Sequence, residues 1–403
     1  MSALILWISA VLALALLWWA FRRKPRSTAP AAVPRTATTP RQPPQEPLPP
    51  PALRQGFDAL AVAVPARQEH RAAAPDAEPP AELAALAWRR LQDLDADRRA
   101  ALTEAIRGIP RPPRSMQQLL SPEFVARADS SQLADLVMTE PLIAAKVLGA
   151  VNSPRYGLQR PISHLGQAVT FLGMNTVRSI CLQYMLAEAF KPGHASARQA
   201  FDALWRACGL ASELAVHLGK AMNLPQQAGL ATQVVLGFVG QLASASLLPA
   251  DQLKRWMDED RIGRARLEQD LIGLNACELG QLLMHSWSLP AGLIEDVGDS
   301  GRVLVTPVSQ VDTTRAPTLG LASLCHHLGE HPADAHTADS AGLMDHLSGR
   351  ADTFHLAGYL AHPGLARLPA ALASAEVQAC LDRVLDAPEN PGQAEPQALP
   401  AAA

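Results

Sequence analysis

The sequence predicts an all-α fold, a bundle of many short helices, and two observations lead to it. Apolar residues recur with the 3.6-residue period of a helix, as over residues 177–185, and no run of alternating strand residues stands out. Hydrophobic residues make up 48% of the 403 residues but aromatic ones only 4%. A core of mostly Leu, Ala and Val suits helices packed on helices better than sheets.

The charge and the cysteines argue against several classes of protein. A net charge of −3 lacks the basic footprint of a nucleic-acid binder, so no nucleic-acid partner is expected. The five cysteines form no CxxC pair, which argues against a disulfide framework or a zinc ribbon. Neither a P-loop nor a dinucleotide fingerprint occurs, and no cofactor is expected.

Residues 3–21 are predicted to form a transmembrane anchor. The segment Ala3–Phe21 carries no charge, and as a helix it would span about 28 Å, close to the thickness of a hydrocarbon core. Basic residues follow at once over residues 22–26, so the N-terminus should lie outside and the rest of the chain in the cytoplasm. The alternative, a cleaved signal peptide, usually carries positive residues before the apolar run, and here only Met1 and Ser2 precede it.

The remainder divides into four segments by composition. Residues 22–82 are rich in proline and are expected to be a disordered linker. Helical patterns fill residues 83–300, the main domain, and parts of residues 301–386, a C-terminal extension. In the extension, helices are predicted notably over residues 318–329 and 375–385. The sequence leaves open whether this extension packs on the main domain or forms a separate partner-binding cap. Residues 387–403 are rich in Pro, Ala and Gln and are expected to be a disordered tail.

One series of residues is more specific than a general helical pattern. It consists of Asn152, Ser153, Tyr156, Gly157, Pro161, Ala168, Leu172, Gly173, Trp287 and Pro290. This series resembles the signature of the HDOD family, bacterial relatives of the HD-type phosphohydrolases, and the resemblance extends over about residues 105–300. We interpret the matching residues as structural, since each can cap a helix, shape a turn or fill the core.

The resemblance also places the metal ligands of an HD hydrolase, and this chain lacks them. HD enzymes hold their metal ions through histidines and an adjacent His-Asp pair, and the metal activates water. The chain contains no His-Asp dipeptide, and Gly237 and Phe238 stand at the positions of the pair. Two further positions carry Ala207 and Asn275. The resemblance therefore implies a degenerate HD site, and no enzymatic activity is expected.

A cluster of histidines near the C-terminus offers a weak alternative metal site. His327, His331 and His336 lie close together in the sequence, and the first two are four residues apart. We expect Gly329 and Pro332 to break any helix there, so that the histidines lie in a polar surface loop. A residual metal-dependent phosphohydrolase of HD type remains the alternative function.

The resemblance implies a role in bacterial signalling, as a scaffold or output domain. We expect a non-catalytic adaptor that is anchored in the inner membrane and binds a cytoplasmic signalling protein or a signalling ligand. A small nucleotide is one such ligand, and its phosphates could contact Arg178, Arg206 or Lys220.

Overall fold

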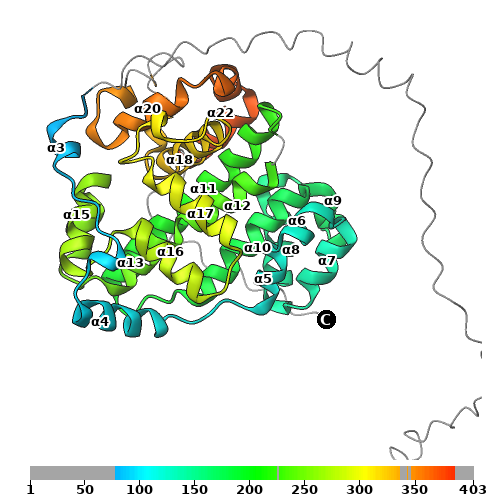
Figure 1. Cartoon of the computed structure of the whole chain (residues 1–403). Helices are drawn as coiled ribbons and strands as arrows, with labels where there is room; N and C mark the ends of the chain where they lie inside the picture. The colour runs from blue at the N-terminus through cyan, green and yellow to red at the C-terminus, as the bar shows by residue number, and fades with distance from the viewer. Residues whose placement is uncertain (1–77, 225–226, 336–342, 344–345, 386–403) are drawn as a thin grey trace, which may run out of the picture. The chain divides into compact units, whose positions relative to one another are not determined.

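A computed structural model describes residues 78–224, 227–335, 343 and 346–385. Every regular element in these ranges is an α-helix or a short 3₁₀-helix, which confirms the predicted all-α bundle (Figure 1). The predicted anchor, nearly all of the predicted linker, His336 and the predicted tail fall outside the described residues.

The helices form three groups along the chain. The first group is α3 (Ala81–Ala84), α4 (Ala96–Arg107), α5 (Arg114–Leu120), α6 (Pro122–Arg127), α7 (Ser130–Met138), α8 (Pro141–Val151) and α9 (Leu165–Leu172). The second is α10 (Met174–Ala189), α11 (Ala195–Ala221), α12 (Gln227–Gly237), α13 (Val239–Leu247), α14 (Leu253–Asp258), α15 (Arg261–Leu271), α16 (Ala276–Ser286) and α17 (Ala291–Arg302). The third is α18 (Ala316–Glu330), α20 (Phe354–Leu360), α21 (Leu368–Leu372) and α22 (Ala375–Leu385).

Short polar side chains start several of these helices. Asp95, Asp129, Asp260 and Asn275 each accept a hydrogen bond from the backbone N–H three residues further on. Such caps satisfy N–H groups that have no partner inside the helix and are each worth about 1 kcal/mol. The caps at Asp260 and Asn275 fix the starts of α15 and α16, which border the candidate site described below.

Helix α11, with 27 residues, runs through the middle of the bundle. In Figure 1 the α5–α9 group lies to its right, α13–α16 lie to its left, and α18–α22 lie along the top. Its most extensive contacts are with α18 and α12. The extension after residue 300 therefore packs on the main domain, a question that the sequence left open. The helices predicted near residues 318–329 and 375–385 are confirmed as α18 and α22.

One segment of the described chain, Gly229–Leu247, is long and apolar enough to cross a membrane. It comprises most of α12 and all of α13, and 83% of it is buried inside the bundle. Burial in the core therefore accounts for its apolar character. Four of the five cysteines, namely Cys181, Cys208, Cys325 and Cys380, are also buried.

Helices α13 and α16 approach one another closely because glycine stands at both sides of their contact. A Cβ atom on Gly240 would lie 1.8 Å from the carbonyl oxygen of Ala276. On the other side, a Cβ atom on Gly280 would lie 3.0 Å from the backbone nitrogen of Gly240. Since backbone cannot move aside as a flexible side chain can, the two helices would have to separate to admit a methyl group.

We therefore expect Gly240→Ala to lower the free energy of unfolding by about 3 kcal/mol or more. The matched control is Gly149→Ala in α8, where an added Cβ meets nothing within 4 Å. That exposed helical position should gain up to about 1 kcal/mol from the better helix propensity of alanine. Urea unfolding of the full-length protein in detergent measures both, and equal effects at the two positions would contradict the close contact.

Glu268 is a buried carboxylic acid that joins three helices. Its Oε1 accepts a hydrogen bond of 2.9 Å from Trp256 Nε1 on α14, and its Oε2 accepts one of 2.6 Å from the backbone N–H of Ala276 on α16. Burial disfavours the charged form and raises the pKa of Glu268 to about 7, although these hydrogen bonds oppose the shift. The folded protein therefore holds a proton on Glu268 more tightly than the unfolded chain does.

This raised pKa predicts how stability depends on pH. Between the ordinary pKa of about 4.5 and the folded value of about 7, the folded state keeps a proton that the unfolded state has lost. Stability from this group is complete below pH 4.5 and falls by about 3 kcal/mol as the pH rises through 7. We expect Glu268→Gln to flatten the pH dependence of the unfolding free energy over this window, and Glu104→Gln, at an exposed position, to leave it unchanged.

Candidate functional site

Helix α18 lies against three of the four positions that the HD resemblance assigns to metal ligands. Ala207 on α11 meets Gly329 of α18 so closely that a Cβ atom on Gly329 would lie 2.5 Å from the Ala207 carbonyl oxygen. A Cβ atom on Gly237 would lie 3.1 Å from Nδ1 of His326. The ring of Phe238 stacks on the ring of His326, with centroids 3.9 Å apart and planes 11° apart. Helix α18 thus fills the space beside Ala207 and Phe238 and narrows the space beside Gly237.

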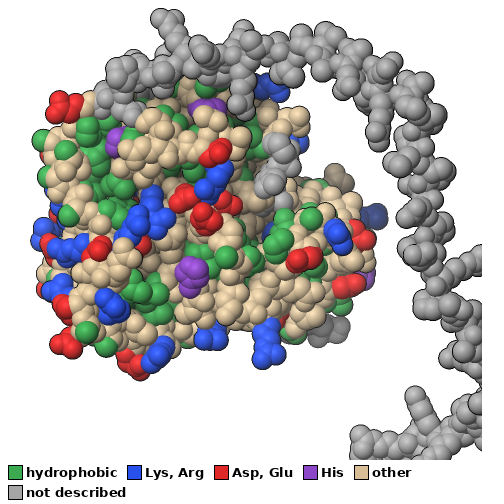
Figure 2. Space-filling model, in the orientation of Figure 1, with side chains coloured by type: hydrophobic (Ala, Val, Ile, Leu, Met, Phe, Trp, Pro, Cys, Tyr) green, Lys and Arg blue, Asp and Glu red, His purple; other side chains and the backbone are tan. Residues whose placement is uncertain are grey.

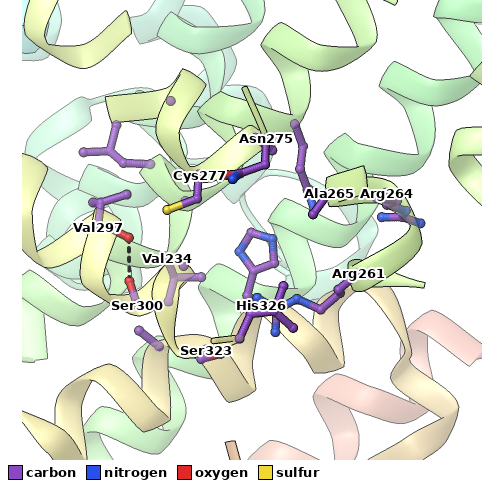
Figure 3. Close-up of a pocket in the computed structure, with 18 of the residues that line it drawn as sticks. Val234, Arg261, Arg264, Ala265, Asn275, Cys277, Val297, Ser300, Ser323 and His326 are labelled. Carbon is purple, nitrogen blue, oxygen red and sulfur yellow. Dashed lines mark hydrogen bonds between the residues drawn. The ribbon is translucent and has the colours of Figure 1, made fainter. Parts of the chain in front are cut away.

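The side chain at the fourth position, Asn275, caps the N-terminus of α16. Its Oδ1 accepts from the backbone N–H of Glu278 at 3.2 Å, which caps α16, and its side chain is buried. Its Nδ2 donates a long hydrogen bond, 3.4 Å, to the Gln269 side chain. Asn275 and Gly237 both line a cavity in which His326 also lies (Figure 3). Of the four positions, these two are therefore the ones that border an open space.

His326 is held as a neutral imidazole. Burial is the main reason that its pKa falls to about 4, and the nearby cations Arg261 and Arg264 lower it further, while Glu330 opposes them. Its ring makes no hydrogen bond within the described residues, and its packing is the stack on Phe238. Such a ring can donate one hydrogen bond and accept another without carrying charge.

A buried ion pair fixes the end of α18 beside the cavity. Arg264 Nη1 lies 2.9 Å from Glu330 Oε1, and Gln241 Nε2 donates to the same oxygen at 2.7 Å. Burial of Glu330 favours its neutral form, but Arg264 outweighs that effect and the pKa of Glu330 falls to about 2. Nε and Nη2 of Arg264 donate to the carbonyl oxygens of Trp256 and Met257. Each of the three guanidinium nitrogens of Arg264 therefore has a partner within the protein.

His327 does not lie in a surface loop, so that expectation was wrong for this candidate, whereas His336 lies outside the described residues. Helix α18 continues through Gly329 and ends at Glu330, one residue before His331, and His327 is fully buried within it. His327 Nε2 lies 2.8 Å from Asp334 Oδ2, and this hydrogen bond lowers the pKa of Asp334. The rings of His327 and His331 are 5.1 Å apart. Among the described residues, which exclude His336, no group of three or more His, Cys, Asp or Glu side chains could hold a metal ion.

The signature residues lie elsewhere, and several of them line a groove. Asn152 ties the loop that follows α8, since its side chain accepts from the Ile162 N–H at 2.7 Å and donates to the Ile162 carbonyl at 2.7 Å. Gly157 has a φ of 56°, a left-handed conformation that favours glycine. Ser153, Tyr156 and Leu172 line a groove of about 1000 Å³ between α8–α11 and α22. We call it the α22 groove.

The other signature residues serve the core and the helix ends. Ala168 and Trp287 are buried, Pro290 precedes α17, and Gly173, with a φ of 84°, joins α9 to α10. Pro161 lies on the exposed loop before α9. The basic residues considered for a nucleotide do not line the cavity beside α18: Arg178 is buried, whereas Arg206 and Lys220 are exposed.

Sequence reasoning missed the residues that make up this site. Arg261, Arg264 and Glu268 lie in a helix without any recognisable motif, and Ser323 lies on α18 beyond the resemblance. The adjacent histidines at 326 and 327 were the one available signal, but they point to different partners, Phe238 and Asp334. Only the tertiary contact between α18 and α11–α13 brings the set together.

Comparison with known proteins identifies the family. A model of the HDOD domain matches residues 109–300. Among solved structures, an HDOD domain protein of unknown function from Geobacter sulfurreducens is 17% identical, covers 72% of this chain and 99% of its own, and has a TM-score of 0.49. A protein of Shewanella amazonensis named as a candidate phosphohydrolase is 20% identical, covers 71% and 98%, and has a TM-score of 0.47. No curated protein matches the sequence. Residues 109–300 of this chain are an HDOD domain, a signalling-associated member of the HD-like helical domains.

Proposed function

We propose that this protein is a non-catalytic signalling adaptor, tethered to the bacterial inner membrane by residues 3–21, whose HDOD domain binds a cytoplasmic protein partner. The observation that carries the proposal is the stack of Phe238 on His326. An HD hydrolase needs its His-Asp pair to hold a metal ion, and here a phenylalanine ring and a helix from the extension fill that place. The chain thus has the helical bundle but not the His-Asp pair that would bind a metal ion.

The α22 groove is the surface that we assign to the partner. Its lining is mostly apolar, and Phe171, which packs edge-on against Tyr156, is 49% exposed there. Glu213 and Glu376 also line it, and its described lining contains no Lys or Arg. Apolar grooves of this kind accept amphipathic segments, and acidic rims favour segments that carry basic residues. The face in Figure 2 shows both signs of charge interspersed over its described part, without a broad basic field.

The tether gives the adaptor a physical advantage. A domain that is confined near the membrane meets a membrane-associated partner at a raised local concentration, because the search volume is smaller. A linker of about 60 residues leaves the domain free to reorient while it remains close to the bilayer. Affinity for the partner can therefore be modest.

The first prediction concerns metal. Full-length protein that is purified in detergent without chelators should contain manganese, iron and zinc far below stoichiometric amounts, because His326 is stacked on Phe238 and His327 is bonded to Asp334. Elemental analysis measures this. Near-stoichiometric metal that is lost in His327→Ala but kept in His164→Ala, at an exposed position, would support the residual hydrolase instead.

The second prediction concerns the partner. A photo-crosslinking amino acid at Phe171, in the α22 groove, should capture one defined protein in cells of the native organism. The matched control is Leu271 at the end of α15, which is 46% exposed, close to the 49% of Phe171, but lies outside the groove. Charge reversal by Glu376→Lys should weaken the adduct at position 171. The same adducts at both positions, or none at 171, would contradict the assignment of the groove.

A further inference from the structure

The cavity beside α18 is small and polar, and residues of both the HDOD domain and the C-terminal extension line it. Its volume is about 90 Å³. Pockets that bind drug-sized ligands have volumes of roughly 300–1000 Å³, so this smaller cavity suits a group of a few heavy atoms. Helices α12, α15, α16 and α17 of the HDOD domain form most of its wall, and Ser323 and His326 of α18 complete it (Figure 3). Because α18 lies beyond residues 109–300, the site is not one that the HDOD domain could form alone.

Two buried polar groups of this cavity lack partners. Ser323 is 2% exposed, and its hydroxyl makes no hydrogen bond in the described part of the chain. Arg261 Nη1 is buried without a hydrogen-bond partner, and in Figure 3 the Arg261 side chain extends toward the His326 ring. A buried polar group without a partner costs about 1–3 kcal/mol, and a charged one costs more. Two such groups at one cavity indicate a ligand that satisfies them.

The neighbouring carboxylates leave the charge of Arg261 unpaired. Glu330 holds Arg264 and Gln241 through Oε1, and its Oε2, which has no partner, does not belong to the cavity wall. Glu268 accepts from Trp256 and from the backbone of Ala276, and it lies protonated or half-protonated near neutral pH because burial raises its pKa to about 7. The guanidinium of Arg261 is always protonated. It lowers the pKa of Glu330 and of Asp352 through space, but it forms an ion pair with neither of them in the described part of the chain.

The donors define the class of ligand. Arg261 and Ser323 donate hydrogen bonds, and neutral His326 can donate one more, which together favour an anionic oxygen group. Gln241 also lines the cavity, and because its Nε2 donates to Glu330, its Oε1 is left as an acceptor without a donor. A protonated phosphate offers both anionic oxygens and an O–H donor, whereas a carboxylate offers no donor. Phosphate therefore matches the set better than a carboxylate does.

We propose that this cavity binds a phosphate group through Arg261, Ser323 and His326, either as free inorganic phosphate or as the terminal phosphate of a small phosphomonoester. The anion would link α15 to α18 and so stabilise the extension on the HDOD domain. This inference adds a ligand to the proposed adaptor. Only the role of that ligand in signalling rests on the proposed function. Binding itself is a separate property of the cavity.

Isothermal titration calorimetry of the full-length protein in detergent tests the site, with inorganic phosphate and glycerol phosphate as probes and chloride at equal ionic strength as the blank. We expect saturable binding of one equivalent, weakened at least roughly tenfold in Arg261→Gln. Ser323→Ala, which removes only an unpartnered hydroxyl, should fold normally and bind several-fold more weakly. Arg255→Gln, at an exposed arginine of α14, should bind as the unaltered protein does.

The outcomes distinguish free phosphate from a phosphomonoester as the ligand, and they distinguish failure of the phosphate site from failure of the proposed adaptor function. Tighter binding of glycerol phosphate than of phosphate identifies a phosphomonoester as the ligand, and the reverse order identifies free phosphate. No saturable binding, or equal binding in Ser323→Ala, Arg255→Gln and the unaltered protein, overturns the site. If phosphate does not bind but the crosslink at Phe171 still forms, the phosphate site is wrong and the proposed adaptor function is retained. If phosphate binds but no crosslink forms at Phe171, the phosphate site is retained and the adaptor function is wrong.

Discussion

The close packing of α18 on α11, α12 and α13 is the constraint on which the rest of this structure depends. At one end of the contact Gly329 brings the α18 backbone against Ala207, and one helical turn earlier His326 stacks on Phe238. Small residues at both ends allow the helices to approach, and the aromatic stack fills the space between them. A metal-binding HD site would need histidine and aspartate side chains in this volume. The same contact holds the extension on the main domain.

Two buried polar contacts of α18 fix its position along the bundle. Glu330 is almost completely buried and would be costly there without Arg264 and Gln241. His327, equally buried, is bonded to Asp334 just after the helix. A shift of α18 by one turn would break both sets of contacts at once, so the helix has a single favourable register. Within that register Arg261 and Ser323 remain without partners, which is why the cavity between them is a site for a ligand.

The sequence was sufficient for the fold and insufficient for the site, and the reasons are physical. Helical periodicity and the residues that start or end helices are short-range signals. They could therefore predict that the chain is helical, and they could predict the helices near residues 318–329 and 375–385. The reading of Gly329 as a helix breaker failed because helix propensity is worth only about 1 kcal/mol, and the contact with Ala207 outweighs it. The docking of α18 joins residues that are far apart in the sequence, such as Gln241 and Glu330 at 89 positions and Arg264 and Glu330 at 66, and no local pattern encodes such pairings. For the same reason His327 was expected in a surface loop, although it is buried in α18.

The central claim is that α18 is an integral part of the folded core, and hydrogen exchange of the full-length protein in detergent tests it most directly. Backbone amides of α18 should exchange as slowly as those of α11 and α12, because opening α18 would expose the Phe238 stack and unpair Glu330. Peptides covering residues 316–330 and 195–221 can be compared within one experiment. Equal protection in the two helices is the result that this account predicts. Rapid exchange in α18 beside a protected α11 would show that the extension is loosely attached, and the account of the filled site would then be wrong.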